Sequence, residues 1–430
     1  MTETEPLATG PDVLAPPPPP REGKAVRVLV AALGAGLLFG PWAAAALGAR
    51  SDAVPGENRA LAERPDWHGF KTFEDITTYA ADRFPLRDLA IRANKRFTTD
   101  VFGENPSYAS DAGAAVGGVP STKPQAEVAQ VISGRDGWLY FFDDFRRACR
   151  PDVPLDTVLA GVRRMDALLA ASGRRLVLTV PPDKSTVDPQ FLPADYVDRA
   201  CSVPAKAERW RALAGLDVPG YVDVRTPIEA QEKKTGVPAY LPLDTHWTQL
   251  SSTIFVQAVA NRLDPALATG TSVVPLGTTK YGGDLSAIAG NPQTGTEQAF
   301  AIRRKGVTVA KTEEALNEGY VLTHVRSTAS GGAAVFGPRT VLIGDSFTQR
   351  ALDKFAPYFG DLVRVPELSK AILAGNLPQA TDRMLQEIAG SKVVVVELVE
   401  RTFAGAKDGS PFGAAFLDRL EATLARAPKR

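Results

Sequence analysis

Two apolar stretches near the end of the chain decide the fold: RTVLIGDSF, residues 339–347, and KVVVVELVE, residues 392–400. Each is a nearly continuous run of aliphatic residues, which is typical of strands buried on both faces of a parallel sheet. RRLVLTVPP, residues 174–182, and the shorter YVDV, residues 221–224, precede them, and VRVPEL, residues 363–368, lies between them. These five stretches predict the strands of one sheet.

Helical patterns alternate with these strands. Apolar residues recur at helical spacing in three segments: 155–172, about 205–216 and about 249–263. The alternation predicts an α/β fold, a three-layer sandwich with a mostly parallel sheet. We expect a hairpin at VISGRDGWLYFF, residues 131–142, because Asp136-Gly137 tolerates the positive φ angles of a tight turn. Residues 270–297 indicate a long insertion, and YVLTHVRS, residues 320–327, alternates like an antiparallel strand.

The amino-terminal part of the chain differs from the rest. Residues 1–24 are polar and Pro-rich, and we expect a disordered cytoplasmic tail there. Residues 25–49 contain an uncharged stretch of about twenty residues, the length of a transmembrane helix. Basic residues precede it, so the positive-inside rule keeps the N-terminus in the cytoplasm and exports the rest. A cleaved signal peptide is the alternative, since the stretch ends in small residues. The prediction is a single-pass protein of the cell membrane with an extracytoplasmic neck and linker, residues 50–125, and a main domain, residues 126–430.

Charge and cysteine content limit the possible partners. The 49 basic and 49 acidic residues give a net charge of zero, so a nucleic-acid partner is not expected. Cys149 and Cys201 are the only cysteines, and an exported domain allows them to form a disulfide; two unpaired buried thiols are the alternative. The cysteines and three histidines do not have metal-site spacing, and no phosphate-binding Gly-rich loop is present. We therefore predict neither a metal nor a cofactor.

Three polar residues are candidates for catalysis. Ser346 follows a predicted strand in Gly-Asp-Ser, at the end of the sheet where ligands gather, although such a turn also occurs as a simple helix cap. A serine hydroxyl needs a base, and that base needs an orienting group. In LPLDTHW, an extended chain would place Asp244 and His246 on one side, so that the carboxylate meets one ring nitrogen and Ser346 the other. Trp247 would then form a wall of the pocket.

Six motifs follow one another along residues 134–403: GRDGWLYF, PPDKSTV, LDTHW, GGDL, LIGDSF and VVVVELVERTF. In this order they resemble the SGNH-hydrolase-like domain of the alginate O-acetyltransferase family, and ENRALAERP and DRFPLR are similar to the start of that family. The resemblance implies Ser346 as nucleophile, His246 as general base and Asp244 as its orienting acid. It also implies a circular permutation, because the serine block comes first in ordinary SGNH esterases.

The resemblance implies transfer of acetyl groups to hydroxyls of an exported or cell-surface polysaccharide, with the acetyl supplied across the membrane by a separate multi-spanning acyltransferase. An acetyl esterase with the same three residues is the first alternative, and a non-catalytic glycan-binding or assembly subunit is the second. Lys184 and Arg401 lie at predicted strand ends. Each is a candidate for contact with substrate, and a structural ion pair is an equal alternative for each.

Overall fold

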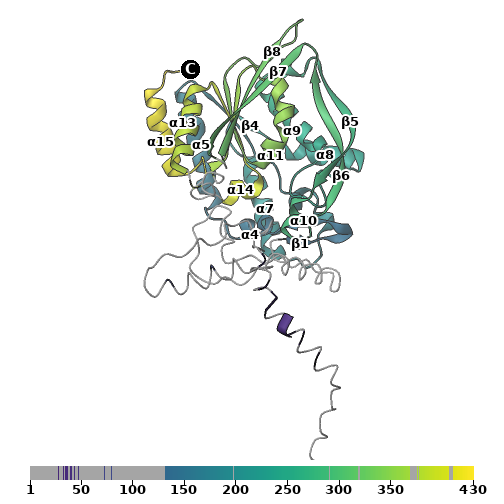
Figure 1. Cartoon of the computed structure of the whole chain (residues 1–430). Helices are drawn as coiled ribbons and strands as arrows, with labels where there is room; N and C mark the ends of the chain where they lie inside the picture. The colour runs from purple at the N-terminus through teal and green to yellow at the C-terminus, as the bar shows by residue number, and fades with distance from the viewer. Residues whose placement is uncertain are drawn as a thin grey trace, which may run out of the picture. The chain divides into compact units, whose positions relative to one another are not determined.

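The computed structural model describes residues 131–430, apart from 197, 290, 318–319, 369–374, 376 and 406–409, and isolated positions between 28 and 79 (Figure 1). The chain divides into two compact units. The first comprises residues 1–52 and 61–89, and the second comprises residues 53–60 and 90–430. All strands and helices named below belong to the second unit. The predicted tail, transmembrane segment, neck and linker lie almost entirely outside the described residues. Among the positions that are described, no helix has the length and apolar character needed to cross a membrane.

A seven-stranded sheet forms the centre of the second unit, and its strands β4, β7 and β8 are labelled in Figure 1. The strand order is β4-β3-β11-β9-β10-β8-β7. The first five strands in this order run parallel, and β8 and β7 add an antiparallel edge. Their bounds are β3 Arg175–Thr179, β4 Tyr221–Val222, β7 Val307–Asn317, β8 Tyr320–Ala329, β9 Thr340–Gly344, β10 Leu362–Pro366 and β11 Val393–Glu397. The predicted mostly parallel sheet is confirmed, as is the antiparallel strand expected at residues 320–327.

Helices pack on both faces of this sheet. On one face, α9 (Gln249–Leu263) and α11 (Ser346–Phe355) bury aromatic side chains such as Phe255 and Phe347 against Leu342 and Val395. On the other face, α5 (Leu155–Ala171), α13 (Leu377–Gly390) and α15 (Ala414–Arg426) pack against the alternate strand residues, which include Val341 and Val394. Neighbouring strand residues point to opposite faces, so a continuous apolar run supplies both cores.

Two smaller sheets lie outside the central one. Strands β1 (Val131–Ser133) and β2 (Leu139–Phe141) form the predicted hairpin, in which Asp136 and Gly137 adopt φ angles of 56° and 77°. The predicted insertion contains an unpredicted two-stranded ribbon, β5 (Thr271–Gly282) and β6 (Thr294–Arg304), joined through α10 (Asp284–Ile288). Most ribbon residues are exposed or half-buried on both faces, so their sequence lacks the apolar alternation that marks a strand.

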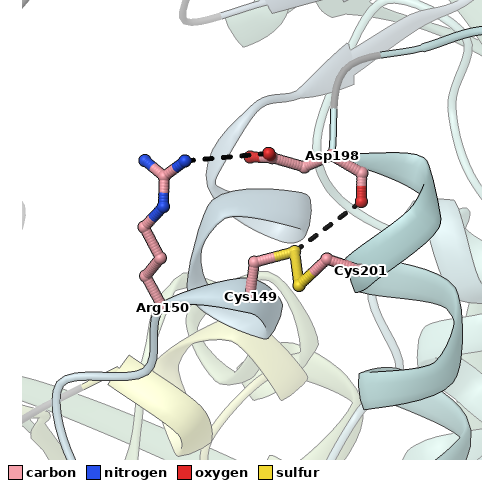
Figure 2. The surroundings of a disulfide bond; sticks show 4 residues. All are labelled: Cys149, Arg150, Asp198 and Cys201. Atoms are coloured by element: carbon pink, nitrogen blue, oxygen red, sulfur yellow. Dashed lines mark hydrogen bonds and ion pairs between the residues drawn. A yellow bond between two sulfur atoms is a disulfide. The ribbon is translucent and has the colours of Figure 1, made fainter.

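The predicted disulfide is confirmed. It joins Cys149, the last residue of α4 (Asp143–Cys149), to Cys201 near the start of α7 (Arg199–Ala214), with the two Cα atoms 5.6 Å apart. Figure 2 shows the Cys149 sulfur directed at the main-chain carbonyl of Asp198, whose carboxylate faces Arg150. The bond therefore holds α4 against α7. The other described helices are α6 (Lys184–Val187), α8 (Arg225–Thr235), α14 (Glu400–Gly405) and the 3-10 turns Arg135–Gly137, Pro189–Phe191, Pro265–Ala268 and Ala356–Tyr358.

Candidate active site

Ser346 is the first residue of α11 and follows the carboxyl end of β9 after a sharp turn, here called the serine turn, residues 344–346. The turn requires glycine at position 344, because a Cβ there would lie 2.8 Å from Glu397 Oε2 and closer still to Thr348 Oγ1. Asp345 caps the helix, since its Oδ1 accepts the Phe347 N–H at 2.9 Å. The strand, the glycine and the cap together present Ser346 at the end of the sheet, half-buried.

A row of hydrogen bonds joins Ser346 to His246 and Asp244. His246 Nε2 lies 2.8 Å from Ser346 Oγ, and His246 Nδ1 lies 2.7 Å from Asp244 Oδ1. The histidine and the serine are 100 positions apart in the sequence. The structure thus brings together the three residues that the sequence singled out, and this arrangement suits removal of the serine proton by the imidazole.

The segment around His246 is a turn and not the expected extended chain. Asp244 Oδ1 accepts the main-chain N–H of His246 at 2.8 Å as well as the bond with its ring. This bond from a side chain to the amide two residues later is typical of an Asx turn. The short aspartate side chain therefore folds the segment back on itself, and the same oxygen orients both the backbone and the imidazole of His246.

Asp244 is held in its charged form. Burial alone would raise the pKa of Asp244, but its hydrogen bonds with His246 and the positive charge of Arg350 lower that pKa to about 2. Arg350 Nη1 donates to Asp244 Oδ1 at 2.9 Å. A carboxylate at this position favours a proton on His246 Nδ1, which leaves Nε2 free to accept the proton of Ser346.

Two residues of this site were not predicted from the sequence. Arg350 lies one helical turn after Ser346, so the i, i+4 spacing on α11 was its only local signal. Asp284 opens α10 in the inserted ribbon and accepts the Thr245 N–H at 2.7 Å and the Thr245 hydroxyl at 2.6 Å. The motif GGDL contains Asp284, but nothing in that motif indicates that it meets the Asp244 segment.

Asp244, His246 and Asp284 could also offer one ligand atom each to a metal ion, since such atoms lie within 4.8 Å of one another. In the structure, however, both imidazole nitrogens are engaged, Nδ1 with Asp244 and Nε2 with Ser346. The carboxylate of Asp284 accepts two bonds from Thr245. A metal ion bound through Nδ1 would replace the bond that orients the imidazole, so the donor set fits the hydrogen-bonded row better than a metal centre.

A second buried carboxyl supports the serine turn. Glu397, at the end of β11, accepts the Asp345 N–H at 3.2 Å and the Thr348 hydroxyl. Burial and the neighbouring Asp345 raise the pKa of Glu397 well above its usual range. Asp345 Oδ2 accepts the Val399 N–H at 3.0 Å, so the ends of β9 and β11 are tied together just before Ser346.

The three side chains predicted to contact substrate make other contacts within the protein. Trp247 is 2% exposed and packs against Phe255 and Phe347. It therefore belongs to the hydrophobic core next to the site and does not line an open pocket. Lys184 is 1% exposed, and its ammonium donates to the main-chain carbonyls of Leu139, Leu241, Pro242 and Asp244. It therefore fixes the segment that carries Asp244.

Arg401 takes the structural alternative that the sequence left open. Its Nη1 lies 3.0 Å from Asp183 Oδ1 and 3.3 Å from Asp144 Oδ1, and both carboxylates are buried. These carboxylates and the packing of its guanidinium over the Phe141 and Phe347 rings account for the side chain. Arg401 therefore belongs to a buried ion network beside the site.

Comparison with known proteins identifies the family of the chain. Residues 131–399, more than half of the chain, match the model of the family described as "SGNH hydrolase-like domain, acetyltransferase AlgX". The chain belongs to this family. The predicted resemblance to the alginate O-acetyltransferases and the SGNH-hydrolase-like α/β fold are thereby confirmed.

Individual relatives match over part of their length. "Probable alginate O-acetylase AlgJ" of Pseudomonas putida is 30% identical over 135 residues, which are 30% of this chain and 33% of that protein. The protein of the same name from Pseudomonas fluorescens is 29% identical over 133 residues, 31% of this chain and 33% of that one. The chain thus matches about a third of these relatives. Among solved structures, the O-acetyltransferase domain of Pseudomonas putida AlgJ has a TM-score of 0.44 at 20% identity, covering 68% of this chain and 98% of that domain. Pseudomonas aeruginosa AlgX has a TM-score of 0.42 at 13% identity, covering 69% of this chain and 67% of that one.

Proposed function

We propose that this protein is an extracytoplasmic O-acetyltransferase that forms an acetyl ester on Ser346 and passes the acetyl group to a hydroxyl of an exported or cell-surface polysaccharide. The observation that carries the proposal is the hydrogen-bonded row of Asp244, His246 and Ser346 in a member of an acetyltransferase family. The relatives' names supply alginate as one such polysaccharide.

In the first half of the reaction, His246 Nε2 takes the Ser346 proton while Oγ attacks the acetyl carbonyl carbon of the donor. The negative charge on the carbonyl oxygen meets the Ser346 N–H, which lies in the first turn of α11 and so has no partner within the helix. The Asp244 carboxylate stabilises the imidazolium that forms. Collapse of the intermediate breaks the bond to the donor's leaving group, which takes the proton from His246.

In the second half, the same groups act in the reverse direction. An acceptor hydroxyl gives its proton to His246 Nε2 and attacks the acetyl carbon, and the bond to Ser346 Oγ breaks as Oγ takes the proton back. Water reaching the ester first would produce acetate. Transfer therefore requires that the sugar hydroxyl be held close to the ester, which makes the acceptor site as important as the three reacting residues.

The membrane arrangement is part of the proposal. A transmembrane helix within residues 25–49 with a cytoplasmic N-terminus would hold the domain outside the membrane, where the polysaccharide is found. A multi-spanning acyltransferase would then supply the acetyl group from the cytoplasmic side. The Cys149–Cys201 disulfide supports an oxidising, extracytoplasmic location.

The test is the intact mass of the full chain after brief exposure to p-nitrophenyl acetate, with the wild type beside Ser346→Ala. We expect the wild type to gain one acetyl group and the variant to gain none. The acetylated protein is then split into two samples, one in buffer and one in a solution of polysaccharide oligomers. Faster loss of the adduct with sugar, accompanied by acetylated oligomer, supports transfer. Acetate release that is indifferent to sugar would make the protein an esterase, and an adduct retained in Ser346→Ala would refute Ser346 as the nucleophile.

A further inference from the structure

The side-chain ammonium of Lys184 is enclosed by four main-chain carbonyl oxygens, here called the carbonyl cage. Lys184 is the first residue of α6 and is buried. The distances from its Nζ to the four oxygens are 2.6 Å to Leu139, 2.6 Å to Leu241, 2.8 Å to Pro242 and 3.3 Å to Asp244. Three of the four contacts are therefore short hydrogen bonds, and all four acceptors belong to the backbone.

The carbonyl cage matches a charged amine and not a neutral one. An ammonium has three N–H donors and no acceptor, which is the number that three short bonds to carbonyls require. A neutral amine would direct its lone pair at one of these oxygens. The ring centroids of Trp138 and Tyr140 lie 4.7 Å and 5.2 Å from Nζ, and aromatic faces also attract a cation. The contacts thus assign a positive charge to Lys184.

Two opposing effects act on this charge. Burial lowers the pKa of Lys184 to about 7, and nearby carboxyls act in the other direction. These carboxyls belong to Asp188, Asp144, Asp284 and Asp244. The ammonium form is therefore dominant at about pH 6, one unit below that pKa, and the experiments described below use this pH.

The carbonyl cage connects β2 to the segment that carries the orienting acid and the base. Besides sharing the ammonium, Leu139 donates its N–H to the Pro242 carbonyl at 2.9 Å. Leu241 donates its N–H to the His246 carbonyl at 3.2 Å. A shift of residues 241–244 would therefore move the carboxylate and the imidazole of the hydrogen-bonded row relative to the serine.

We propose that the carbonyl cage is a monovalent-cation site that the chain fills with its own ammonium, and that Lys184 is a positioning residue for acetyl transfer. The charge holds Asp244 and His246 where the imidazole can take the Ser346 proton. Main-chain carbonyls replace the hydration shell of potassium in ion channels, so a cage without the lysine side chain should accept potassium or ammonium ion. The inference rests on the proposed acetylation of Ser346 for its kinetic measurement, and it adds a residue that acts without touching the substrate.

The first test removes the charge in two ways, in the full-length chain. Lys184→Ala leaves the cage empty, whereas Lys184→Met fills it with an apolar side chain of similar length. Acetylation of Ser346 by p-nitrophenyl acetate is followed at about pH 6. We expect the maximal rate to fall about 100-fold in both variants, the size of a misplacement of about 1 Å. The ester concentration that gives half of the maximal rate should stay unchanged, because Lys184 does not contact the ester.

The second test supplies the missing cation. Ammonium chloride and potassium chloride should raise the rate of Lys184→Ala at least about tenfold and leave Lys184→Met and the wild type unchanged. Tetramethylammonium chloride at equal ionic strength is the salt control, since that ion is large and has no N–H. At this pH almost no free ammonia is present to attack the ester. Lys392→Ala is the control variant, because Lys392 donates to a single carbonyl, that of Gly173, from an exposed position.

Three results would overturn the proposal. A wild-type rate in Lys184→Met would show that the charge is dispensable, and an equal response of both variants to ammonium would refute the cation site. If neither variant folds, Lys184→Arg and Lys184→Gln replace them, since both keep N–H donors and only arginine keeps the charge. Lys184→Arg should then react at least about tenfold faster than Lys184→Gln. Equal rates, or loss of folding in all four variants, would make Lys184 a folding residue alone.

Thermal melting separates this inference from the proposed function, because it requires no activity. Ammonium should raise the Tm of Lys184→Ala above its value in tetramethylammonium and should not do so for Lys184→Met. If the wild type forms no acetyl adduct, the proposed function fails, and the Tm values still test the cation site. If the wild type forms the adduct but ammonium changes neither the rate nor the Tm of Lys184→Ala, the cation site alone fails.

Discussion

Two clusters of charged residues contact Phe347, and they differ in what their polar atoms can do. The ring of Phe347 is 5.0 Å from that of His246, in the hydrogen-bonded row, and 5.4 Å from the guanidinium of Arg401, in the buried ion network. That network comprises Asp144, Asp183, Lys206, Arg209, Glu400 and Arg401.

The two clusters differ in what their basic groups contact. In the network, the three acids are buried, and each base forms an ion pair with one of them. In the row, His246 Nδ1 contacts the Asp244 carboxylate, whereas Nε2 contacts the hydroxyl of the half-buried Ser346, a group that can give up a proton. The comparison teaches that a charged residue in such a cluster is a catalytic candidate when one of its polar atoms faces a group that can react, and not when it is held in ion pairs alone.

The largest expected effect is the loss of turnover in His246→Ala. Removing the base of a serine, histidine and aspartate arrangement lowers turnover by on the order of 10⁴-fold or more. Stability should fall by no more than about 2 kcal/mol, because the buried Asp244 carboxylate loses its bond with the ring but keeps Arg350. The measurement is acetyl transfer from p-nitrophenyl acetate beside a thermal melt. His324→Ala serves as the control, since His324 pairs with Glu314 on β7. A wild-type rate in His246→Ala would show that His246 is not the base and that the row does not differ in function from the network.

A substitution in the buried ion network should lower stability and not turnover. Arg401→Met leaves Asp144 and Asp183 buried beside an apolar side chain, and breaking a buried ion pair in this way costs about 3–5 kcal/mol of unfolding free energy. Urea denaturation measures the loss. Arg164→Met is the matched control, because Arg164 pairs with Asp418 and Glu421 at the surface and its loss should not be measurable. Equal stability of the two variants would show that the network contributes no more than a surface pair.

The sequence predicted the row but not its surroundings, for physical reasons. An apolar strand followed by Gly-Asp-Ser and the short spacing of Asp244 and His246 are local patterns, and local patterns determine how those side chains are presented. Asp284 comes from the inserted ribbon, and Arg350 lies one helical turn after Ser346 on α11. Both meet the Asp244 segment only through tertiary packing. Burial is also a tertiary property, so the sequence leaves Lys184 and Arg401 open between substrate contact and a structural ion pair, and it places Trp247 at a pocket wall that the structure does not show.

Low pH should reduce the stability of the protein, because Asp244 in the row becomes protonated. Its pKa of about 2 in the folded state lies below the ordinary value of 3.8. The unfolded state therefore binds more protons between these values, so the contribution is present above about pH 4 and is lost as the pH falls towards 2. The shift corresponds to about 2 kcal/mol. Urea denaturation at a series of pH values should show a shallower acid loss in Asp244→Asn than in the wild type. Parallel curves would mean that the bonds from His246 and Arg350 do not hold this carboxylate.

The smallest expected effect concerns Arg350, which touches Asp244 but not the serine. Arg350→Gln removes one of the charges that lower the pKa of Asp244, so the pKa of that carboxyl should rise towards its ordinary value. We expect turnover at neutral pH to fall by at most about tenfold, as for other groups that orient a catalytic residue. Urea denaturation should show a smaller loss of stability between about pH 4 and pH 2 than in the wild type, a change that a purely structural role would not produce. Arg326→Gln is the control, because Arg326 pairs with Asp361 away from the row. If the acid loss of stability equals that of the wild type while turnover falls, Arg350 acts on the position of Asp244 and not through its charge.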